Sequence, residues 1–329
     1  MLNLEATKGA CEFCGCADSV SLLKAKGADI HSSQIFQAVK CRACGLVYLY
    51  PRIARQQYQE LDTAEFYKKK NDLLHRFFEL CLDFFILLRL KKFRRFFKNP
   101  GSVLDVGCAE GKFLKAMASF GWDVYGVDVS ANAIEAAKAK DLKQLWCQDI
   151  FDAQLPNTRF DLITFWQSFE HLSEPLQALK KVAAFLKRDG MIFVSVPNID
   201  SLEARMSLKS WFGLDLPRHH FLYSPGTLKR LLEAAGFKVV ALSKNSLEYN
   251  VPMFMMTFLN FLRGETNWFY NFVKRHEFAR TNLLLREYTV LLSIFLIPLI
   301  LVFSPFLYLT NILSGNGSVI EIFARSKDV

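Results

Sequence analysis

A glycine-rich turn between a buried strand and a helix constrains the fold of this chain more than any other feature. Residues 102–106 (Ser-Val-Leu-Asp-Val) are typical of a short buried strand, and a helix is expected to begin after Gly107-Cys-Ala-Glu-Gly111. The spacing differs from the dinucleotide fingerprint G-x-G-x-x-G because Ala109 takes the middle position, and no Gly-Lys-Ser/Thr of a phosphate loop follows. Such a turn lets a ligand approach the backbone and the helix N-terminus.

Strands and helices alternate after this turn. A strand over residues 122–128 ends in Asp128, where a carboxylate is placed to accept hydrogen bonds from both hydroxyls of a ribose. This pace of alternation predicts an α/β fold with a parallel, doubly wound sheet. The elements expected beyond Asp128 are a helix at 131–140, strands at 142–147 and 160–166, a helix at 176–186 and a strand at 190–196.

Four cysteines near the N-terminus have the spacing of metal ligands. Cys11-x-x-Cys14 and Cys41-x-x-Cys44 are each followed by glycine, and two such turns present four thiolates to one tetrahedral Zn²⁺. A closed set of four ligands indicates structural rather than catalytic zinc, and Cys16 is a spare that can mimic a ligand. The alternative is a set of unrelated buried or redox cysteines. Disulfides are not expected, because the cysteine usage fits a reducing compartment.

Four segments resemble, in order and spacing, the motifs of class I S-adenosylmethionine-dependent methyltransferases: LDVGCAEGKF, GVDVS, CQDI and FDLITFWQSFEHL. The resemblance runs from about Val103 to Val240 and resumes at Gly317. Residues 216–237 are similar to one branch, which contains quinone-type O-methyltransferases and methyltransferases of cell-surface glycan pathways. Many of the latter also carry a CxxC…CxxCGLVY ribbon. The resemblance implies a Rossmann-like seven-stranded methyltransferase sheet with an N-terminal zinc ribbon and a hydrophobic helical insertion before the last strand.

The resemblance also implies S-adenosylmethionine as cofactor. Gly107 and Gly111 would line its methionine part, Asp128 would bind the ribose, and Asp149 with Ile150 would flank the adenine. The full implied cofactor set is Asp105, Gly107, Gly111, Asp128, Asp149, Ile150 and Gln167, with Asp105 supporting the loop from beneath.

Ala109 stands where the family more commonly has glycine. Its one methyl group narrows the pocket slightly, and the residue needs no positive φ if its backbone stays in the β or α region.

Methyl transfer from a sulfonium is an in-line displacement, so positioning supplies much of the acceleration. A hydroxyl acceptor must also lose its proton, and histidine is best matched to that task near neutral pH. His171, after the strand at 160–166, and His219, in a loop before the next helix, are joint candidates for this catalytic base. For each the alternative is structural: His171 as a cap or a partner of Glu170, and His219 as a hydrogen-bonding element of a lid.

Two further segments carry most of the chain's excess charge and apolarity. Of the net charge of +9, much lies in residues 68–98, within a helix expected over 64–97. Its basic end is either the solvated end of a cap helix or a contact with anionic head groups. Residues 288–320 contain no charged side chain, and a helix over Leu291–Leu309 would rise about 29 Å, close to a bilayer core of ~30 Å.

Topology argues against a single membrane crossing by this segment. The sixth strand is expected at 237–242 and the seventh at 318–325. The resemblance implies that these two strands pair antiparallel, so both ends of the insertion return to one sheet. We expect a re-entrant hairpin or interfacial helices; the alternative is a buried helical subdomain or a dimer face.

These expectations divide the chain into a zinc ribbon (1–50), a basic and aromatic helical cap (51–98), a methyltransferase domain (99–245 and 315–329) and a membrane-associated insertion (246–314). The predicted function is O-methylation of a lipid-linked sugar or glycan precursor, or a similar small acceptor, at the membrane surface. The alternatives are a quinone-type phenol O-methyltransferase and a non-catalytic membrane-bound binding scaffold.

The predicted location is the cytoplasm, with peripheral or monotopic attachment to the inner face of the membrane, since no secretory signal is recognisable. No nucleic-acid partner is expected, because the basic charge is local rather than spread over one face. A nicotinamide oxidoreductase is disfavoured by the absent G-x-G-x-x-G, and the oligomeric state is not predicted.

Overall fold

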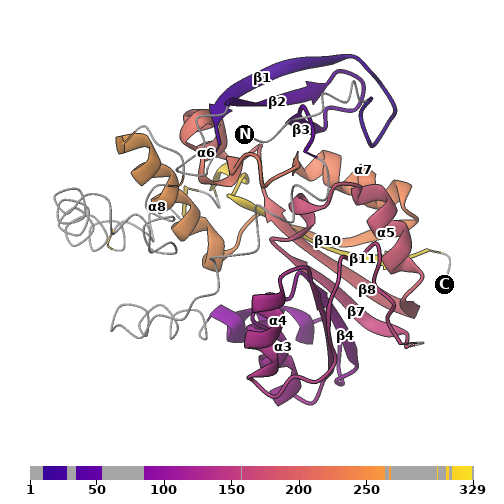
Figure 1. Cartoon of the computed structure of the whole chain (residues 1–329). Helices are drawn as coiled ribbons and strands as arrows, with labels where there is room; N and C mark the ends of the chain where they lie inside the picture. Colours follow the sequence, from indigo (N-terminus) through magenta and orange to yellow (C-terminus); the bar gives the residue numbers. More distant parts are fainter. Residues whose placement is uncertain are drawn as a thin grey trace.

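A computed structural model describes residues 10–27, 35–53, 85–156, 158–263, 267, 302, 309–310 and 313–327. Two sheets dominate it, one of seven strands and one of four (Figure 1). Residues 64–84 of the helix predicted over 64–97, and most of the apolar stretch Leu291–Leu309, lie outside the described residues.

The larger sheet contains both parallel and antiparallel strand pairs, in agreement with the predicted α/β fold. Its parallel part pairs Leu104 with both Tyr125 and Ile163, and its last two strands run antiparallel to their neighbours, as predicted for the sixth and seventh strands. The strands in spatial order are β10 (Phe237–Ser243), β11 (Val319–Ser326), β8 (Leu186–Pro197), β7 (Phe160–Trp166), β4 (Ser102–Val106), β5 (Asp123–Asp128) and β6 (Leu145–Cys147).

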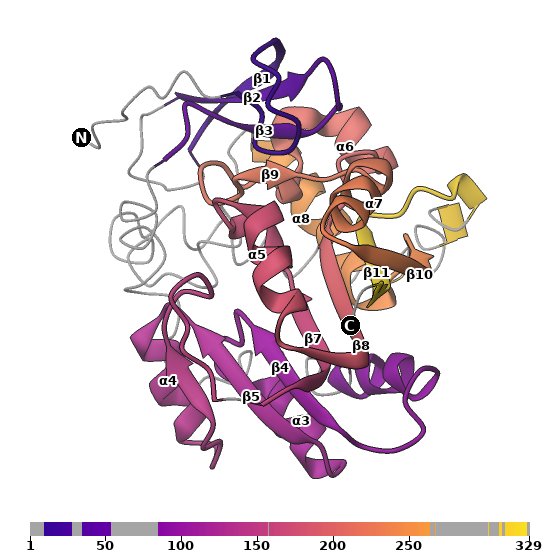
Figure 2. The ribbon, with the colours of Figure 1, turned by 90° about the vertical axis from the view of Figure 1, so that its right-hand side faces the viewer.

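Helices cover both faces of this sheet. Consecutive strand residues point to opposite faces, and because both sets are buried, both faces need a cover. On β8, Ile192 and Val194 join the core under α5 (Pro175–Ala183) and α7 (Pro225–Ala234), whereas Phe193 joins the opposite core. That second core contains α3 (Lys112–Ser119) and α4 (Ala131–Lys138). Figure 2 shows α5 in front of the sheet, with the four-stranded sheet above it.

The four-stranded sheet joins the N-terminal segment to a loop far along the chain. It consists of β1 (Ser19–Lys26), β2 (Ile35–Cys41), β3 (Val47–Tyr50) and the short β9 (Phe221–Leu222), with β3 and β9 antiparallel. Tyr48 shares a core with Phe221 and Tyr223. The sequence did not predict this strand partner, because a two-residue strand carries no periodic signal.

Residues 85–94 form a helix that packs on the second core. The Phe93 ring lies 5.4 Å from that of Phe193 and 5.8 Å from that of Phe113, centroid to centroid. Arg89 pairs with Glu248 and Lys92 with Glu321, so these two cations of the basic end face protein carboxylates. The described part of this helix therefore packs on the main sheet, and these two cations contact protein carboxylates rather than solvent.

The insertion begins with α8 (Leu247–Arg263), which packs beside α6 (Leu202–Ser207) and the 3-10 turns η2 (Leu208–Ser210) and η3 (Phe212–Leu214) (Figure 1). Thr257 Oγ1 accepts the Phe212 N–H at 3.0 Å, and Asn260 Nδ2 donates to Ser210 O at 3.1 Å. Among the described residues, no helix combines the length and apolarity needed to cross a bilayer.

Candidate active site

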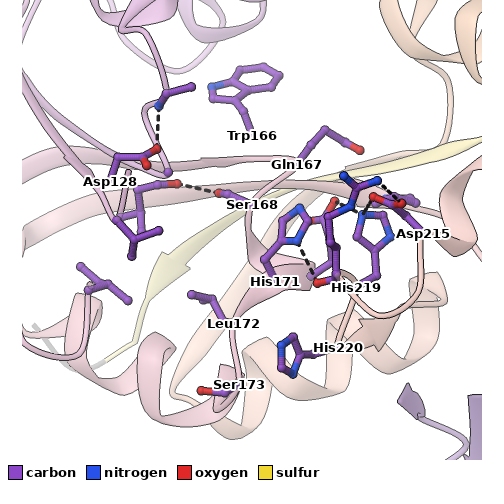
Figure 3. Close-up of a pocket in the computed structure, with 18 of the residues that line it drawn as sticks. Asp128, Trp166, Gln167, Ser168, His171, Leu172, Ser173, Asp215, His219 and His220 are labelled. Atoms are coloured by element: carbon purple, nitrogen blue, oxygen red, sulfur yellow. Dashed lines mark hydrogen bonds and ion pairs between the residues drawn. The ribbon is translucent and has the colours of Figure 1, made fainter. Parts of the chain in front are cut away.

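A cavity of about 400 Å³ opens where the carboxyl ends of β4, β5 and β7 meet. Parallel strands end at one edge of a sheet, so the loops after them converge there. Residues 212–220 and two side chains of α8, Tyr249 and Met253, form the opposite wall. Figure 3 shows Asp128 at one side of this cavity and His171 with His219 at the other, with Gln167 and Ser168 between them.

The turn after β4 needs glycine at Gly107. Its φ is +77°, and a Cβ there would lie 2.5 Å from Ser168 Cβ, while Ser168 Oγ donates to Val106 O at 2.6 Å. Ala109 also adopts a positive φ, +47°, so its backbone does not stay in the ordinary β or α region. Its N–H donates to Asp128 Oδ2 at 2.8 Å, a bond that offsets the roughly 1–2 kcal/mol cost of the left-handed conformation.

Gly111 lies where α3 packs closely against α4. A Cβ there would lie 2.4 Å from Leu142 Cδ1 and 3.0 Å from Ala137 Cβ. The assignment of Gly111 to the methionine pocket stays a prediction. The glycine is needed because α3 begins with a close approach to α4.

Asp128, at the end of β5, accepts hydrogen bonds from two loops. Its Oδ1 accepts the Ser130 N–H at 2.9 Å, and its Oδ2 accepts the Ala109 N–H. Asp149 and Ile150 line the same cavity beyond β6, with Asp149 Oδ1 accepting the Phe151 N–H at 3.0 Å. The structure thus brings together the side chains that were predicted for ribose and adenine.

Two more predicted residues differ in their relation to the cavity. Gln167 lines it, with a φ of +51° and with Nε2 donating to Ser195 Oγ at 3.0 Å. Asp105 lies beneath the loop, buried, and accepts a 2.7 Å hydrogen bond from Thr164 Oγ1. Burial raises the pKa of Asp105 to about 7, with Asp128 adding to the rise.

The two candidate bases, distant in sequence, meet at the other end of the cavity. His171 belongs to the turn η1 (Phe169–His171), and its ring centroid lies 4.8 Å from that of His219 in an edge-to-face arrangement. Their Nδ1 atoms lie 2.9 Å from Arg218 O and 2.8 Å from Gly213 O, respectively. Burial lowers the pKa of His219 to about 3, with His171 contributing, so its ring is neutral near pH 7.

Three charged neighbours surround this pair, and sequence reasoning missed two of them, Asp215 and Arg218. The Glu170 carboxylate lies 3.9 Å from His219 Nε2, and Asp215 Oδ2 lies at the same distance from that nitrogen. Arg218 forms an ion pair with Asp215. Only Glu170 carried a signal, its position next to His171; Asp215 and Arg218 lie in a loop without periodicity.

The four predicted ligand cysteines converge in the N-terminal sheet. Cys11 Sγ lies 3.6 Å from Cys44 Sγ, and Cys14 Sγ lies 3.5 Å from Cys41 Sγ. Tetrahedral zinc with Zn–S bonds near 2.3 Å requires sulfur–sulfur distances of about 3.8 Å, so small shifts suffice to seat the metal. Cys16 stands outside the group of four and contacts Asp18 instead.

A family model described as a methyltransferase domain matches residues 73–242. The chain is 39% identical over 101 residues to the ubiquinone biosynthesis O-methyltransferase of Coxiella burnetii, covering 29% of this chain and 43% of that protein. It is 29% identical over 162 residues to the protein of the same name from Idiomarina loihiensis, covering 45% of this chain and 65% of the relative. The chain thus spans less than two thirds of the length of these curated relatives.

Among solved structures, the chain is similar to an S-adenosylmethionine-dependent methyltransferase from Archaeoglobus fulgidus. The TM-score is 0.48 and the sequence identity 21%, with 78% of this chain and all of that chain covered.

The buried Asp105 predicts a pH dependence of stability. Because its folded pKa lies above its usual value, its stabilising contribution is complete below pH about 4 and is lost as pH rises through about 7. The side chain that Asp105→Asn introduces cannot ionise. The unfolding free energy of this variant, measured relative to wild type, should therefore rise by more than about 1 kcal/mol between pH 4 and pH 8. Urea unfolding of both proteins across this range measures the difference, and parallel pH profiles would contradict the prediction.

Proposed function

Because this chain belongs to the family of proteins with a methyltransferase domain, we propose that it transfers a methyl group from S-adenosylmethionine to a small acceptor. One observation carries the proposal: a single cavity joins the glycine turn and Asp128 to the cluster of Glu170, His171 and His219. The first group suits a nucleoside-containing cofactor, and the second suits the hydroxyl from which a proton must leave.

The cofactor end has the donors and acceptors that a ribose needs. The Asp128 carboxylate lines the cavity and is held in place by two backbone N–H groups. A carboxylate in this position suits the two hydroxyls of a ribose, while Asp149 and Ile150 flank the adenine. When bound, the cofactor supplies an electrophilic methyl group. Gly107 keeps side-chain bulk away from the turn so that the cofactor can approach the backbone.

At the acceptor end, the residues hold the hydroxyl and receive its proton. We propose that the cluster of Glu170, His171 and His219 acts on this proton as a unit, because the two rings and the carboxylate lie together. Phe212 and the α8 residues Tyr249 and Met253 form an apolar wall beside it. This wall supports an acceptor with an apolar portion, which it orients toward the methyl group while water is excluded.

We propose that the acceptor is a lipid-linked hydroxyl compound. Of the two classes considered from the sequence, the phenolic one gains support from the relatives named ubiquinone biosynthesis O-methyltransferase. The glycan class rests on the resemblance of the cysteine ribbon alone. The proposal therefore favours a prenylated phenol, with the lipid-linked sugar as the alternative.

Asp128→Asn should weaken S-adenosylmethionine binding at least tenfold, because the charge-assisted hydrogen bonds to ribose lose about 1.5–3 kcal/mol. Titration calorimetry measures this affinity. Asp123→Asn, at the opposite end of β5, is the matched control and should bind the cofactor as wild type does.

Wild type should also move labelled methyl from the cofactor into the phenolic fraction of a membrane-lipid extract. Wild-type affinity in Asp128→Asn would contradict the cofactor assignment, and label in lipid-linked sugar would favour the alternative acceptor.

We also propose that the four cysteines hold a structural zinc ion, supported by their sulfur–sulfur distances. Elemental analysis of wild type should find about one zinc per chain. Cys44→Ser should lose it, whereas Cys147→Ser, an exposed cysteine outside the group, should keep it. Because β3 pairs with β9, hydrogen exchange should also quicken around residues 215–223 in Cys44→Ser. Equal zinc content in the two variants would contradict this proposal.

We propose further that the protein attaches peripherally to an anionic bilayer on the cytoplasmic side through α6, η2 and α8. Large apolar side chains are exposed on these adjoining elements, and the cation Arg205 stands among them. Apolar and cationic groups together suit the head-group region. The exposed apolar residues are Leu202, Met206, Leu208, Phe258, Phe261 and Leu262. The same α8 lines the acceptor end of the cavity, so attachment there delivers a lipid-linked acceptor to the site.

The combined substitution of Met206, Phe261 and Leu262 by serine should lower partitioning onto phosphatidylglycerol-containing vesicles at least tenfold, since each side chain contributes about 1 kcal/mol or more on burial. Vesicle sedimentation measures this. Substituting the exposed Val20 and Leu22 of β1 by serine is the matched control and should leave partitioning unchanged. Equal loss in both variants, or no wild-type binding to the vesicles, would contradict attachment through this face.

A further inference from the structure

A network of buried amide side chains connects the insertion to the acceptor end of the cavity. Asn260, on α8, donates through Nδ2 to Ser210 O at 3.1 Å and to Asn267 Oδ1 at 3.3 Å. Asn267, beyond the end of α8, in turn donates through Nδ2 to Asp215 Oδ1 at 2.6 Å. Both asparagines are 1% exposed, and Asp215 lines the cavity. The network therefore ends on a charged side chain of the site.

Asp215 contacts the candidate base His219 in two ways. Its carbonyl oxygen accepts the backbone N–H of His219 at 3.1 Å, and its Oδ2 lies 3.9 Å from His219 Nε2. Because His219 Nδ1 lies 2.8 Å from Gly213 O and a carbonyl only accepts, the ring proton is assigned to Nδ1 and the lone pair to Nε2. The carboxylate thus faces the nitrogen that can take up a proton. Figure 3 shows Asp215 and His219 at the same end of the cavity.

The charge of Asp215 favours a proton on this nitrogen. Burial lowers the pKa of His219, and His171 and Arg218 lower it further, whereas the negative charge of Asp215 raises it. Glu170, on η1, is the second carboxylate at 3.9 Å from His219 Nε2. Asp215 acts in this way only while it is ionised. Although burial raises the pKa of Asp215, Arg218 and His219 together bring that pKa below its usual value.

The backbone of Asp215 adopts a conformation that its surroundings must support. Its φ is +26°, in a region that a residue other than glycine occupies only where neighbouring contacts fix it. Two donors reach its Oδ1, one from Arg218 and one from Asn267. Arg218 belongs to the same loop, whereas Asn267 belongs to the insertion and connects Asp215 to α8 through Asn260.

We propose that Asn267 is a positioning residue of the acceptor end, whose hydrogen bond fixes the Asp215 carboxylate opposite His219 Nε2. This inference rests on the proposed methyl transfer. In that reaction the acceptor hydroxyl gives its proton to His219 Nε2 while the oxygen–methyl bond forms and the sulfur–methyl bond breaks, with sulfur keeping the electron pair. Asp215 then faces the positive charge of the protonated ring, and Asn267 holds it there. The insertion thus contributes a polar group to the chemistry as well as an apolar wall.

The first measurement follows the Asp215 carboxylate by nuclear magnetic resonance of the full chain, labelled with carbon-13 at its aspartate side chains. Asn267→Gly removes the amide, and glycine adopts the positive φ of this residue, +56°, without strain. A hydrogen bond to the ionised form lowers the pKa of a carboxyl group. The Asp215 signal, assigned by its absence from Asp215→Asn, should therefore move more between pH 7 and pH 4 in Asn267→Gly than in wild type.

The second measurement is the turnover number with saturating S-adenosylmethionine and, as the acceptor probe, a phenol that carries one farnesyl chain. Asn267→Gly should lower turnover about tenfold or more, because proton transfer loses its oriented carboxylate, while calorimetry finds unchanged cofactor affinity. If Asn267 acts through Asp215, the double variant should be no slower than Asp215→Asn alone, whereas independent losses multiply. The matched control is Asn316→Ser, at an asparagine that accepts from Lys244 Nζ at 3.1 Å, and its turnover should equal that of wild type.

An Asp215 signal that titrates alike in Asn267→Gly and wild type would overturn the inference, as would unchanged turnover or multiplying losses in the double variant. Wild type that binds no S-adenosylmethionine, or that methylates no farnesyl phenol, would contradict the proposed function instead. The Asp215 signal would then still decide whether Asn267 holds the carboxylate. Should Asn267→Gly fail to fold, Asn260→Ser, which removes the anchor of Asn267, decides the outcome through the same two measurements.

Discussion

The loop that carries His219 is held by backbone hydrogen bonds to three separate parts of the chain, and the site depends on this arrangement. The Leu49 N–H of β3 donates to His220 O at 2.9 Å, while the His220 N–H donates to Glu170 O at 2.9 Å. The Ile199 N–H, beyond β8, donates to Tyr223 O at 3.0 Å. The cysteine ribbon, the turn after β7 and the main sheet therefore fix one loop together. A ribbon that looks like an appendage in the sequence is part of the wall behind the site.

The fold was predictable because its signals are local. Short runs of apolar residues mark the strands, a glycine turn follows β4, and Asp128 ends β5. The order of these elements along the chain indicates the sheet. The motif does not report how the residues of the turn pack. A Cβ on Gly111 would clash with Leu142 and Ala137, which lie far along the chain. Ala109 adopts a positive φ, and its N–H donates to Asp128.

Long-range pairing explains what the sequence left undecided. The basic end of the first described helix allowed either solvation or contact with lipid, but the Arg89 partner, Glu248, lies on α8. Tyr249 OH accepts from Arg89 at 2.7 Å, and the guanidinium sits 4.3 Å above the Trp166 ring. Trp166 ends β7, so the cap helix, the insertion and the central sheet meet at one side chain. Tyr249 and Trp166 both line the cavity, which makes the start of the insertion a structural part of the site.

The buried acids provide the sharpest comparison within the molecule. The described chain buries several carboxylates, and most have a clear partner: Asp105 has Thr164, Glu203 has Trp211, Glu248 has Arg89 and Glu321 has Lys92. Each partner donates a hydrogen bond or supplies a positive charge, which offsets the cost of leaving water. Glu170 is the most deeply buried of these acids, and within the described chain neither of its side-chain oxygens has a hydrogen-bond partner. Burial raises the pKa of Glu170 to about 7. The fold satisfies its other buried acids from within, whereas it holds this one at the acceptor end of the cavity in a state that can take up a proton.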